Sequence, residues 1–455
     1  MNSYSSLTPS DAAATGEKLV GRILVRDYRV GIVGLGYVGL PLALAFVKAG
    51  FPVLGFDVDQ VKIDALDART SYIRHIGPEM IAGLYDSGKF EASAEAASLS
   101  TCDAIIICVP TPLSRHREPD LSYIVGTAEA LLPHLKANQL VVLESTTYPG
   151  TTTEVLLPIL ERNGLKGGSD LFIAFSPERE DPGNPHFETR TIPKVIGADD
   201  PVSRQLANTL YAQVIDKTVP VSSAATAEAT KLTENIFRAV NIALVNELKV
   251  IYDRLGIDIW EVIDAAKTKP FGFMPFYPGP GLGGHCIPID PFYLTWKARE
   301  FDITTKFIEL AGEINRDMPY YIIRRVAELL DQQKAKGLNG ARILVLGAAY
   351  KKNVDDLRES PCLHLMDILT ARGARFDYHD PYVGEIKLTR EHPTLAGMVS
   401  VDLTAAQLAL YDAVLIATDH DNVDYELVVA SSSLVIDTRN ATKGVSSGRE
   451  KIFKV

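Results

Sequence analysis

The chain has 455 residues, 46% of them hydrophobic and 23% charged, which is typical of a globular protein of about two to four domains. A formal net charge of -11 without a cluster of Lys and Arg argues against a nucleic-acid binder. No apolar run approaches the ~20 residues that cross a bilayer. The cysteines Cys102, Cys108, Cys286 and Cys362 form no CxxC pair. We therefore expect reduced thiols, no metal site and a cytoplasmic protein.

The first 26 residues are rich in Ser and Ala, contain acidic residues and lack the apolar segment of a signal peptide. We expect residues 1–26 to form a loosely ordered extension. An apolar strand, Tyr28–Val33, is predicted directly after them.

A glycine-rich turn follows that strand, with Gly34, Gly36 and Gly39 in a G-x-G-x-x-G pattern. An Ala/Leu-rich helix comes next, and a second strand, Pro52–Phe56, ends at Asp57. This order is the dinucleotide fingerprint, in which backbone N–H groups approach a pyrophosphate at the helix N-terminus. The carboxylate suits a ribose diol and repels a 2′-phosphate, so we predict NAD rather than NADP. The alternative is a glycine turn in another α/β fold.

Further strands are predicted at Ala104–Val109, Leu140–Leu143 and Leu171–Phe175. Thr111, Thr146 and Glu178 follow their carboxyl ends, where an open parallel sheet binds its ligands. Each of the three could equally be a helix cap or a turn residue. Their shared position at strand ends favours one common crevice.

The stretch Ala224–Leu255 contains no Gly or Pro and predicts a long helix. Glu228, Lys231, Asn235 and Arg238 form one polar stripe on it. Lys231 and Asn235, one turn apart, could stabilise a developing oxyanion. The alternative is an ordinary solvated helix face.

A glycine-lined cysteine occurs in the segment Gly279–Pro291, where Cys286 is followed four residues later by Asp290. Glycines allow close approach of the backbone, and a thiolate beside an acid suggests covalent chemistry. The alternative is a Gly/Pro-rich turn that buries a small cysteine.

The last part of the chain predicts a second Rossmann-like unit without the G-x-G-x-x-G. A helix over Asn315–Leu330 and a linker over 332–340 lead to strands at Ala341–Leu346, Arg375–His379, Ala413–Ala417 and Leu434–Asp437. The turn at Gly347 and the cation of Lys351 suit a pyrophosphate, although an exposed loop pair of lysines would look the same.

These patterns predict an α/β protein with two doubly wound, Rossmann-like parallel sheets joined by a long central helix. The expected domains are an NAD-binding domain over 27–222, a central helical and dimerisation region over 223–330 and a second Rossmann-like domain, for another phosphorylated ligand, over 337–455. The apolar long helix suggests a homodimer or a higher homo-oligomer.

Several motifs in chain order resemble the UDP-glucose/GDP-mannose dehydrogenase family. They are Gly34–Gly39, Val109–Thr111, Ser145-Thr146, Ser176–Glu178, Lys231 with Asn235, Gly283–Asp290 and Arg358–Ser360. Within it, Pro270–Leu294 resembles the UDP-N-acetylglucosamine 6-dehydrogenase branch. The resemblance implies NAD-dependent four-electron oxidation of a sugar nucleotide to a uronic acid, commonly for surface polysaccharide.

The resemblance also implies residue roles. For catalysis it indicates Cys286, Lys231, Asn235, Asp290, Glu178 and Thr146, with Cys286 as nucleophile, Glu178 as general base, and Asp290 and Thr146 holding a water. For NAD it indicates Gly34, Gly36, Tyr37, Val38, Gly39, Asp57, Lys62, Pro110, Thr111, Thr146 and Arg358. For the UDP-sugar it indicates Glu178, Arg179, Lys231, Asn235, Tyr277, Gly279, Gly283, Tyr350 and Lys351.

The sequence departs from the pattern of many UDP-glucose enzymes at two places. Ile289 stands where they carry Lys, and no Arg occurs between Leu255 and Ala298 to serve as a partner-subunit contact to the sugar hydroxyls. These changes suggest a roomier, more apolar pocket for an N-acetyl group. The second acid after Ser-Pro-Glu aligns poorly, and Glu180 and Asp181 are both candidates.

We therefore expect a UDP-N-acetylhexosamine 6-dehydrogenase, with UDP-N-acetylglucosamine as the first candidate. UDP-glucose and UDP-N-acetylmannosamine remain alternatives within the class. A one-step hydroxyacid or alcohol dehydrogenase that does not use Cys286, and a silent nucleotide-binding scaffold, are alternatives from other classes.

Overall fold

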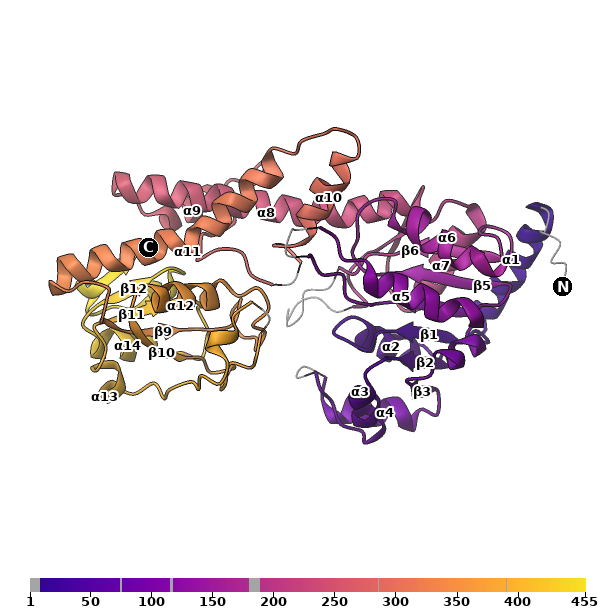
Figure 1. Cartoon of the computed structure of the whole chain (residues 1–455), viewed down its shortest axis with the longest axis horizontal. Coiled ribbons are helices and arrows are strands. Elements are labelled where there is room, and N and C mark those ends of the chain that lie inside the picture. Colours follow the sequence, from indigo (N-terminus) through magenta and orange to yellow (C-terminus); the bar gives the residue numbers. More distant parts are fainter. Residues whose placement is uncertain (1–8, 74–75, 115–117, 180–188, 285, 390) are drawn as a thin grey trace. The chain divides into compact units, whose positions relative to one another are not determined.

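The computed structural model describes residues 9–73, 76–114, 118–179, 189–284, 286–389 and 391–455 (Figure 1). The chain forms two compact units. Unit 1 comprises Met1–Glu234 and Phe292–Asp302, and unit 2 comprises Asn235–Pro291 and Ile303–Val455. Each unit contains its own sheet and its own apolar core.

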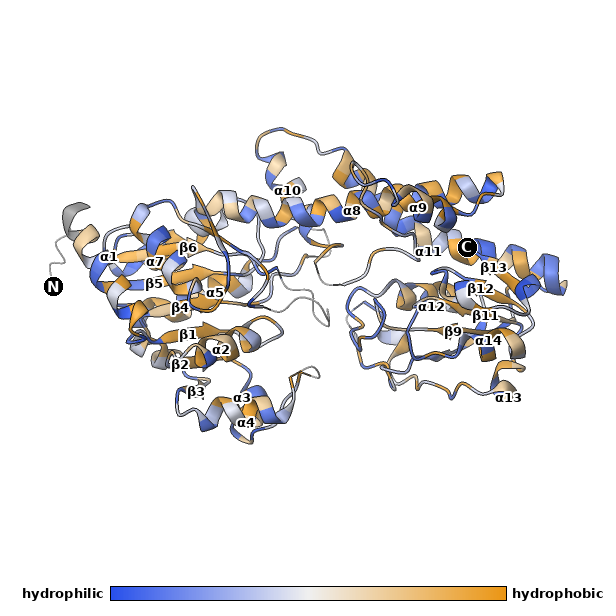
Figure 2. Ribbon diagram, turned by 180° about the vertical axis from the view of Figure 1, so that it is seen from behind, coloured by the Kyte–Doolittle hydropathy of each residue, from blue (hydrophilic) through white to orange (hydrophobic). Residues whose placement is uncertain are grey.

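Unit 1 is built on an eight-stranded sheet in the order β3-β2-β1-β4-β5-β6-β7-β8. The strands are β1 (Val30–Val33), β2 (Val53–Phe56), β3 (Phe90–Ser93), β4 (Ala104–Ile107), β5 (Gln139–Leu143), β6 (Leu171–Phe175), β7 (Lys194–Gly197) and β8 (Thr218–Val221). All neighbours pair in parallel except β6 and β7, which are antiparallel. The central strands are buried apolar runs, as expected for a parallel sheet covered on both faces, and they are orange in Figure 2.

The helical elements of unit 1 flank this sheet. They are α1 (Pro9–Leu24), α2 (Gly39–Lys48), α3 (Gln60–Asp67), α4 (Pro78–Asp86), η1 (Ala96–Thr101), α5 (Ser122–Leu131), η2 (Leu132–His134), the π-helix η3 (Thr152–Leu156), α6 (Leu157–Leu160), η4 (Glu161–Asn163) and α7 (Pro201–Tyr211).

Helix α1 shows that the expectation of a loosely ordered extension is wrong for residues 9–24. Leu19 and Ile23, one turn apart, are buried in the main core of unit 1. Gly16 lies so close to α7 that an added Cβ would be 2.6 Å from Val202. Alanine is the strongest helix former, and an apolar face over α7 stabilises the helix where composition alone suggested disorder.

Long helices connect the two sheets along the chain. They are α8 (Ala224–Leu255), α9 (Ile259–Ala266), α10 (Asp290–Arg299) and α11 (Phe307–Lys334). Helix α8 has the predicted bounds, whereas α11 extends beyond the predicted Asn315–Leu330 at both ends and contains Pro319. Across the described residues, no helix is both long and apolar enough to cross a membrane.

The second sheet has the order β10-β9-β11-β12-β13, with all neighbours parallel. Its elements are β9 (Arg342–Leu346), α12 (Pro361–Ala371), β10 (Arg375–His379), η5 (Pro393–Leu395), α13 (Ala405–Leu408), β11 (Ala413–Ile416), α14 (Tyr425–Ser431), β12 (Val435–Asp437), η6 (Ala441–Gly444), η7 (Arg449–Lys451) and β13 (Ile452–Lys454). The predicted fold class, two parallel-sheet α/β domains with a long central helix, is confirmed.

The strand order reverses once in each sheet, between β1 and β4 in unit 1 and between β9 and β11 in unit 2. Open α/β sheets bind ligands outside the carboxyl ends of the strands at such a reversal. The predicted division into domains at 27–222, 223–330 and 337–455 stays a prediction.

Candidate active site

The turn after β1 has the backbone shape that a bound dinucleotide needs. Gly34 has a φ of 91°, and a Cβ on it would lie 2.6 Å from the carbonyl oxygen of Cys108. A Cβ on Gly39 would lie 1.9 Å from the carbonyl oxygen of Gly34, whereas Gly36 faces open space. No side chain caps the N-terminus of α2 at Val38. The turn therefore leaves backbone N–H groups accessible for a pyrophosphate, and these residues fit NAD.

Asp57, at the carboxyl end of β2, is buried and fixed from several sides. Its Oδ2 accepts hydrogen bonds from the backbone N–H of Leu35 and from Nζ of Lys62, each at 2.8 Å. Its Oδ1 accepts one from the N–H of Asp59 at 3.0 Å. The structure thus brings together two predicted cofactor residues, Asp57 and Lys62, beside the glycine turn.

The ends of β4 and β5 are joined where they leave the sheet. Ser145 donates from Oγ to the carbonyl oxygen of Val109 at 2.7 Å. The backbone carbonyl of Thr111 accepts a hydrogen bond from the hydroxyl of Tyr293, a buried residue of α10. Thr111 and Thr146 are half-buried and Pro110 is exposed. These predicted cofactor residues lie at the carboxyl edge of the sheet, as expected.

The end of β6 is joined to the first half of α8. Lys231 is buried, and its Nζ donates to the backbone carbonyl of Glu178. Arg179 pairs with Glu234 at 2.6 Å and donates to the carbonyl of Pro193 at 2.5 Å. The structure brings Lys231 and Glu178 together, as the catalytic prediction requires, whereas the guanidinium of Arg179 is engaged within unit 1. The candidates Glu180 and Asp181 lie outside the described residues.

A pocket of about 310 Å³, which includes space open to solvent, lies in unit 1 beside these residues. Its lining comprises Val38, Leu42, Glu144, Glu178, Arg179, Thr189, Ile192, Lys194 and Ile215. Glu144 accepts from Nζ of Lys194 at 2.8 Å and from the hydroxyl of Tyr211. Burial raises the pKa of Glu144. Sequence reasoning assigned no role to Glu144, although it directly follows the predicted strand Leu140–Leu143.

The polar stripe on α8 is buried at three of its four residues, whereas Arg238 is exposed. Glu228, Lys231 and Asn235 are all buried. Glu228 accepts hydrogen bonds from the N–H groups of Gly150 (2.6 Å) and Thr152 (2.9 Å) and from the hydroxyl of Thr152 (2.6 Å). It therefore satisfies the N-terminal donors of η3, and its role is structural.

Asn235 is held between a carboxylate and a guanidinium. Its Nδ2 donates to Oδ2 of Asp290, the first residue of α10, and its Oδ1 accepts from Arg238. Asn235 is fully buried and Asp290 is 4% exposed. The two neighbours fix which way the amide points, so the amide donor is pre-oriented.

The thiol of Cys286 stands one helical turn before Asp290. The backbone carbonyl of Cys286 accepts hydrogen bonds from the N–H groups of Ile289 (3.0 Å) and Asp290 (2.8 Å). Residues i and i+4 of such a turn lie on the same face, so thiol and carboxylate share one side of it. Cys286 is half-buried, and all four cysteines are free thiols.

The glycines before Cys286 pack against the last domain. A Cβ on Gly283 would lie 2.7 Å from Cβ of Tyr350, and one on Gly284 would lie 3.0 Å from the ring of Tyr350. The N–H of Gly284 donates to the carbonyl of Arg358 at 3.2 Å. Tyr350 and the Arg358 backbone are therefore what the glycine-lined loop approaches closely.

Two further predicted ligands of the sugar nucleotide lie in this part of unit 2. Gly279 donates its N–H to Asn246 at 3.1 Å, and a Cβ on it would lie 2.4 Å from the guanidinium of Arg439. Tyr277 is 41% exposed and donates to Asp264 at 3.0 Å. Sequence reasoning missed Arg439, which could have been found because it follows the predicted strand Leu434–Asp437.

The turn after β9 lies at the strand-order reversal of the second sheet. Gly347 has a φ of 90°, and a Cβ on it would lie 2.4 Å from Cβ of Thr418. Tyr350 and Lys351 are half-buried, and Nζ of Lys351 is 5.8 Å from the centre of the Tyr350 ring. Arg358, predicted to bind NAD, pairs with Asp356 at 2.6 Å. Among the described residues, no group of three or more His, Cys, Asp and Glu could hold a metal ion.

Three domain models of the UDP-glucose/GDP-mannose dehydrogenase family match the chain in order. They are the NAD binding domain over residues 28–215, the central domain over 225–317 and the UDP binding domain over 344–444. The UDP-N-acetyl-D-glucosamine 6-dehydrogenase of Pseudomonas aeruginosa is 35% identical over 398 residues, which cover 87% of this chain and 91% of that protein.

Other relatives act on different N-acetylated sugars according to their names. The NDP-N-acetyl-D-galactosaminuronic acid dehydrogenase of Ralstonia solanacearum is 33% identical and covers 92% of this chain and 97% of its own. The solved structure of UDP-D-ManNAc dehydrogenase from Pyrococcus horikoshii is similar with a TM-score of 0.84 at 33% identity, covering 92% of this chain and 97% of that one.

Proposed function

Because the chain belongs to the UDP-glucose/GDP-mannose dehydrogenase family, with an NAD-binding and a UDP-binding domain, we propose that it oxidises C6 of a UDP-N-acetylhexosamine to the uronic acid. UDP-N-acetylglucosamine is the first candidate substrate. The observation that carries the proposal is the thiol of Cys286 one turn before Asp290, whose carboxylate accepts from the oriented amide of Asn235. Support for an N-acetylated sugar comes from relatives named for UDP-N-acetylglucosamine and UDP-N-acetylmannosamine.

The proposed chemistry needs four electrons to leave C6. NAD⁺, when bound, accepts one hydride in each of two oxidations. In the first, the C6 hydroxyl loses its proton and C6 becomes an aldehyde. The thiolate of Cys286 then forms a bond to C6, giving a thiohemiacetal, and loss of the second hydride leaves a thioester. Water breaks the C–S bond, so the thiolate is restored and the carboxylate leaves.

Negative charge develops on the substrate oxygen during these steps and must be stabilised by surrounding residues. The ammonium of Lys231 and the amide of Asn235, one turn apart on α8, are proposed to stabilise the alkoxide and the tetrahedral oxyanions. Glu178 is the proposed general base for thioester hydrolysis, and Asp290 with Thr146 would hold the water. Nζ of Lys231 donates to the backbone carbonyl of Glu178, so the two residues are neighbours in this structure.

Binding of the two ligands is assigned to the two strand-order reversals. NAD is proposed to lie at Gly34, Gly36, Tyr37, Val38 and Gly39, with Asp57 and Lys62 at the ribose and Pro110, Thr111, Thr146 and Arg358 as further contacts. The UDP-sugar is proposed to contact Glu178, Arg179, Tyr277, Gly279, Gly283, Tyr350 and Lys351. The tight fit of Gly283 against Tyr350 supports its place in this set.

A homodimer and a cytoplasmic location complete the proposal. An apolar stripe on α8 comprises residues spaced seven apart, Phe237 (47% exposed), Leu244 (50%) and Ile251 (45%). Such exposure is unusual for an apolar stripe that no partner covers. Free thiols at all four cysteines are in keeping with a reducing compartment.

The decisive experiment measures NADH formed per sugar nucleotide consumed across UDP-N-acetylglucosamine, UDP-N-acetylmannosamine, UDP-N-acetylgalactosamine and UDP-glucose. We expect a ratio of two, little free aldehyde, and the highest kcat/KM with an N-acetylated sugar. A ratio of one with accumulating aldehyde would instead establish a one-step dehydrogenase that does not use Cys286. A preference for UDP-glucose would leave the mechanism intact and correct the substrate.

A further inference from the structure

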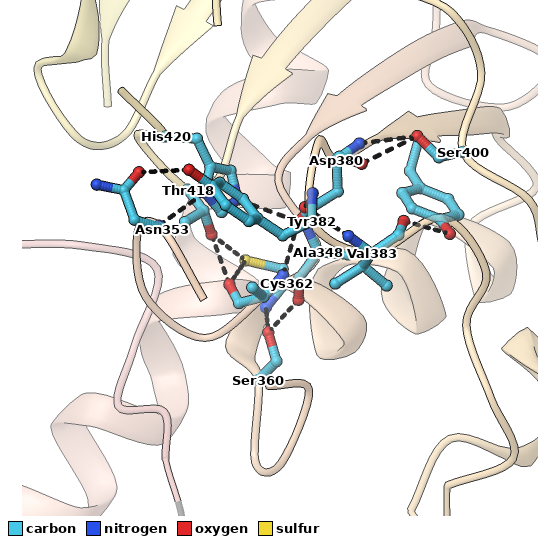
Figure 3. A network of polar contacts seen from close by, with 12 residues as sticks. Ala348, Asn353, Ser360, Cys362, Asp380, Tyr382, Val383, Ser400, Thr418 and His420 are labelled. Atoms are coloured by element: carbon cyan, nitrogen blue, oxygen red, sulfur yellow. Dashed lines mark hydrogen bonds and ion pairs between the residues drawn. The ribbon is translucent and has the colours of Figure 1, made fainter. Parts of the chain in front are cut away.

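A buried carboxylate organises the loop that follows β9. Asp380, which follows β10, accepts at Oδ2 from the backbone N–H groups of Ala348 (2.7 Å) and Ala349 (3.1 Å) and from Nε2 of His420 (3.0 Å) (Figure 3). Its Oδ1 accepts from two more backbone N–H groups, those of Tyr382 and Val383. Burial opposes the charge, yet His420 and these donors hold the pKa of Asp380 below its ordinary value.

His420 extends this network to the far end of the same loop. The imidazole is fully buried and follows β11. Its Nδ1 accepts from the backbone N–H of Asn353 at 2.9 Å, so Nδ1 carries no proton and Nε2 donates to Asp380. The ring of Tyr382 packs against it with centroids 5.1 Å apart. One imidazole therefore bridges Asp380 and Asn353.

Hydrogen bonds also fix most of the backbone between Ala348 and Asn353. The carbonyl of Ala349 accepts from the hydroxyl of Thr418 at 2.7 Å, and that of Ala348 accepts from Ser360 at 2.7 Å (Figure 3). Tyr350 donates its N–H to the carbonyl of Asp356 at 3.0 Å. Tyr350 and Lys351 lie within this hydrogen-bonded segment, at the carboxyl end of β9 where the strand order reverses.

We propose that Asp380 and His420 are positioning residues that hold Tyr350 and Lys351 ready for the diphosphate of the sugar nucleotide. The proposal rests on the proposed function of the chain and adds two residues that do not themselves touch the ligand. A loop fixed before binding loses less conformational entropy when the ligand arrives. Without the Asp380 carboxylate, the N–H groups of Ala348 and Ala349 would be buried without an acceptor, which the loop would relieve by moving.

The test is calorimetric titration of UDP, and separately of NAD⁺, into the full-length protein. Asp380→Asn presents an amide to donors that need an acceptor, and we expect the Kd for UDP to rise by about tenfold. The Kd for NAD⁺ should stay within about twofold, since the proposed NAD contacts other than Arg358 lie in unit 1. His420→Gln keeps a donor for Asp380 and should weaken UDP binding less than His420→Ala.

A matched control is His392→Gln. His392 also bonds an aspartate, Asp367, at 2.5 Å in the same unit, and the contacts described for this pair do not include the loop after β9. We expect UDP binding to be unchanged in this variant.

The possible failures are distinguishable. A wild-type protein that binds no UDP would overturn the proposed substrate class. Wild-type UDP affinity in both Asp380→Asn and His420→Ala would overturn the positioning role alone. Equal losses of UDP and NAD⁺ affinity, with His420→Gln no better than His420→Ala, would show a merely structural network. Should Asp380→Asn fail to fold, the comparison of His420→Gln with His420→Ala decides.

Discussion

The thiol of Cys286 and the ammonium of Lys231 serve different steps of the proposed reaction, so their loss should separate kinetically. In Cys286→Ser the hydroxyl is a far weaker nucleophile, and the second oxidation should stop while the first hydride transfer persists slowly. In Lys231→Ala the cation proposed to stabilise both oxyanions is gone, and the first turnover itself should slow by roughly 10²–10³. Single-turnover NADH formation with UDP-N-acetylglucosamine measures both.

The control for this comparison is Cys102→Ser, which changes a fully buried thiol in the core of unit 1. It should leave the NADH stoichiometry at two. Release of uronic acid by Cys286→Ser at a near wild-type rate would mean that Cys286 is a packed loop residue.

Asp57 and Lys62 form a charged pair at the end of β2, and we predict that the pair binds the ribose and sets cofactor choice. In Asp57→Ala the repulsion of a 2′-phosphate is removed and Lys62 loses its partner at 2.8 Å. The preference for NAD over NADP should narrow by about 1–2 kcal/mol, measured as the ratio of kcat/KM values. The double variant Asp57→Ala/Lys62→Met should recover part of that preference, because no cation remains for the phosphate.

Asp64→Ala, in α3, is the matched control and should leave the ratio unchanged, because among the contacts described the Asp64 side chain bonds only to Gln60. Equal use of both cofactors by the wild type would contradict the prediction.

Individual elements differ in how far the sequence predicts them. Strands β6 and β10 and helix α8 have the predicted bounds. Their runs of apolar residues, or of residues without Gly and Pro, are clear signals for a strand or a helix. Strands β7 and β8 were not predicted. They are short, and β8 is only half-buried, so its pattern lacks a clear alternation. Helix α11 passes through Pro319, as the predicted helix Asn315–Leu330 does, but it begins and ends outside the predicted bounds.

The sequence also predicts only part of the candidate site. Strand-end positions located Thr111, Thr146 and Glu178 because sheet topology determines them. Contacts across the fold were not predictable in this way. The burial of Glu228 against η3 and the approach of Arg439 to Gly279 depend on segments distant in sequence.

Helices α11 and α12 share a histidine contact that should make stability depend on pH. His364 packs edge-on against Tyr320 with centroids 5.3 Å apart and lies 6.4 Å from the ring of His392. Burial and then His392 lower the pKa of His364, although Asp367 opposes this. The folded state therefore disfavours the proton that the unfolded chain binds near pH ~6.5.

It follows that the free energy of unfolding should fall as the pH drops from 7.5 towards 5.5. The loss begins near the unfolded-state pKa of ~6.5 and continues down to the lower pKa of the folded state. His364→Gln should flatten this dependence in urea titrations at the two pH values. Tyr320→Phe, which keeps the ring contact, should retain the wild-type slope. Parallel slopes for His364→Gln and wild type would contradict the assignment.

For the molecule as a whole, the exposed stripe on α8 predicts the assembly state. Leu244 is 50% exposed at its centre, and Leu244→Glu would place a charge in any apolar interface there. We expect the wild type to sediment as a dimer or larger and this variant to shift towards monomer. Leu310→Glu, on α11 and 53% exposed, is the matched control and should not shift. A monomeric wild type would refute the proposed dimer.

The eleven residues Phe292–Asp302 belong to unit 1 although most of unit 1 precedes residue 235. Within them, Tyr293 reaches the Thr111 carbonyl, Trp296 packs on Tyr148 and Lys297 pairs with Glu154 at 2.7 Å. During synthesis these contacts with the first sheet can therefore form only after Asn235–Pro291 of unit 2 has been made. A fragment ending at Glu234 would lack this cover, and supplying the missing segment as a separate peptide is the natural way to restore it.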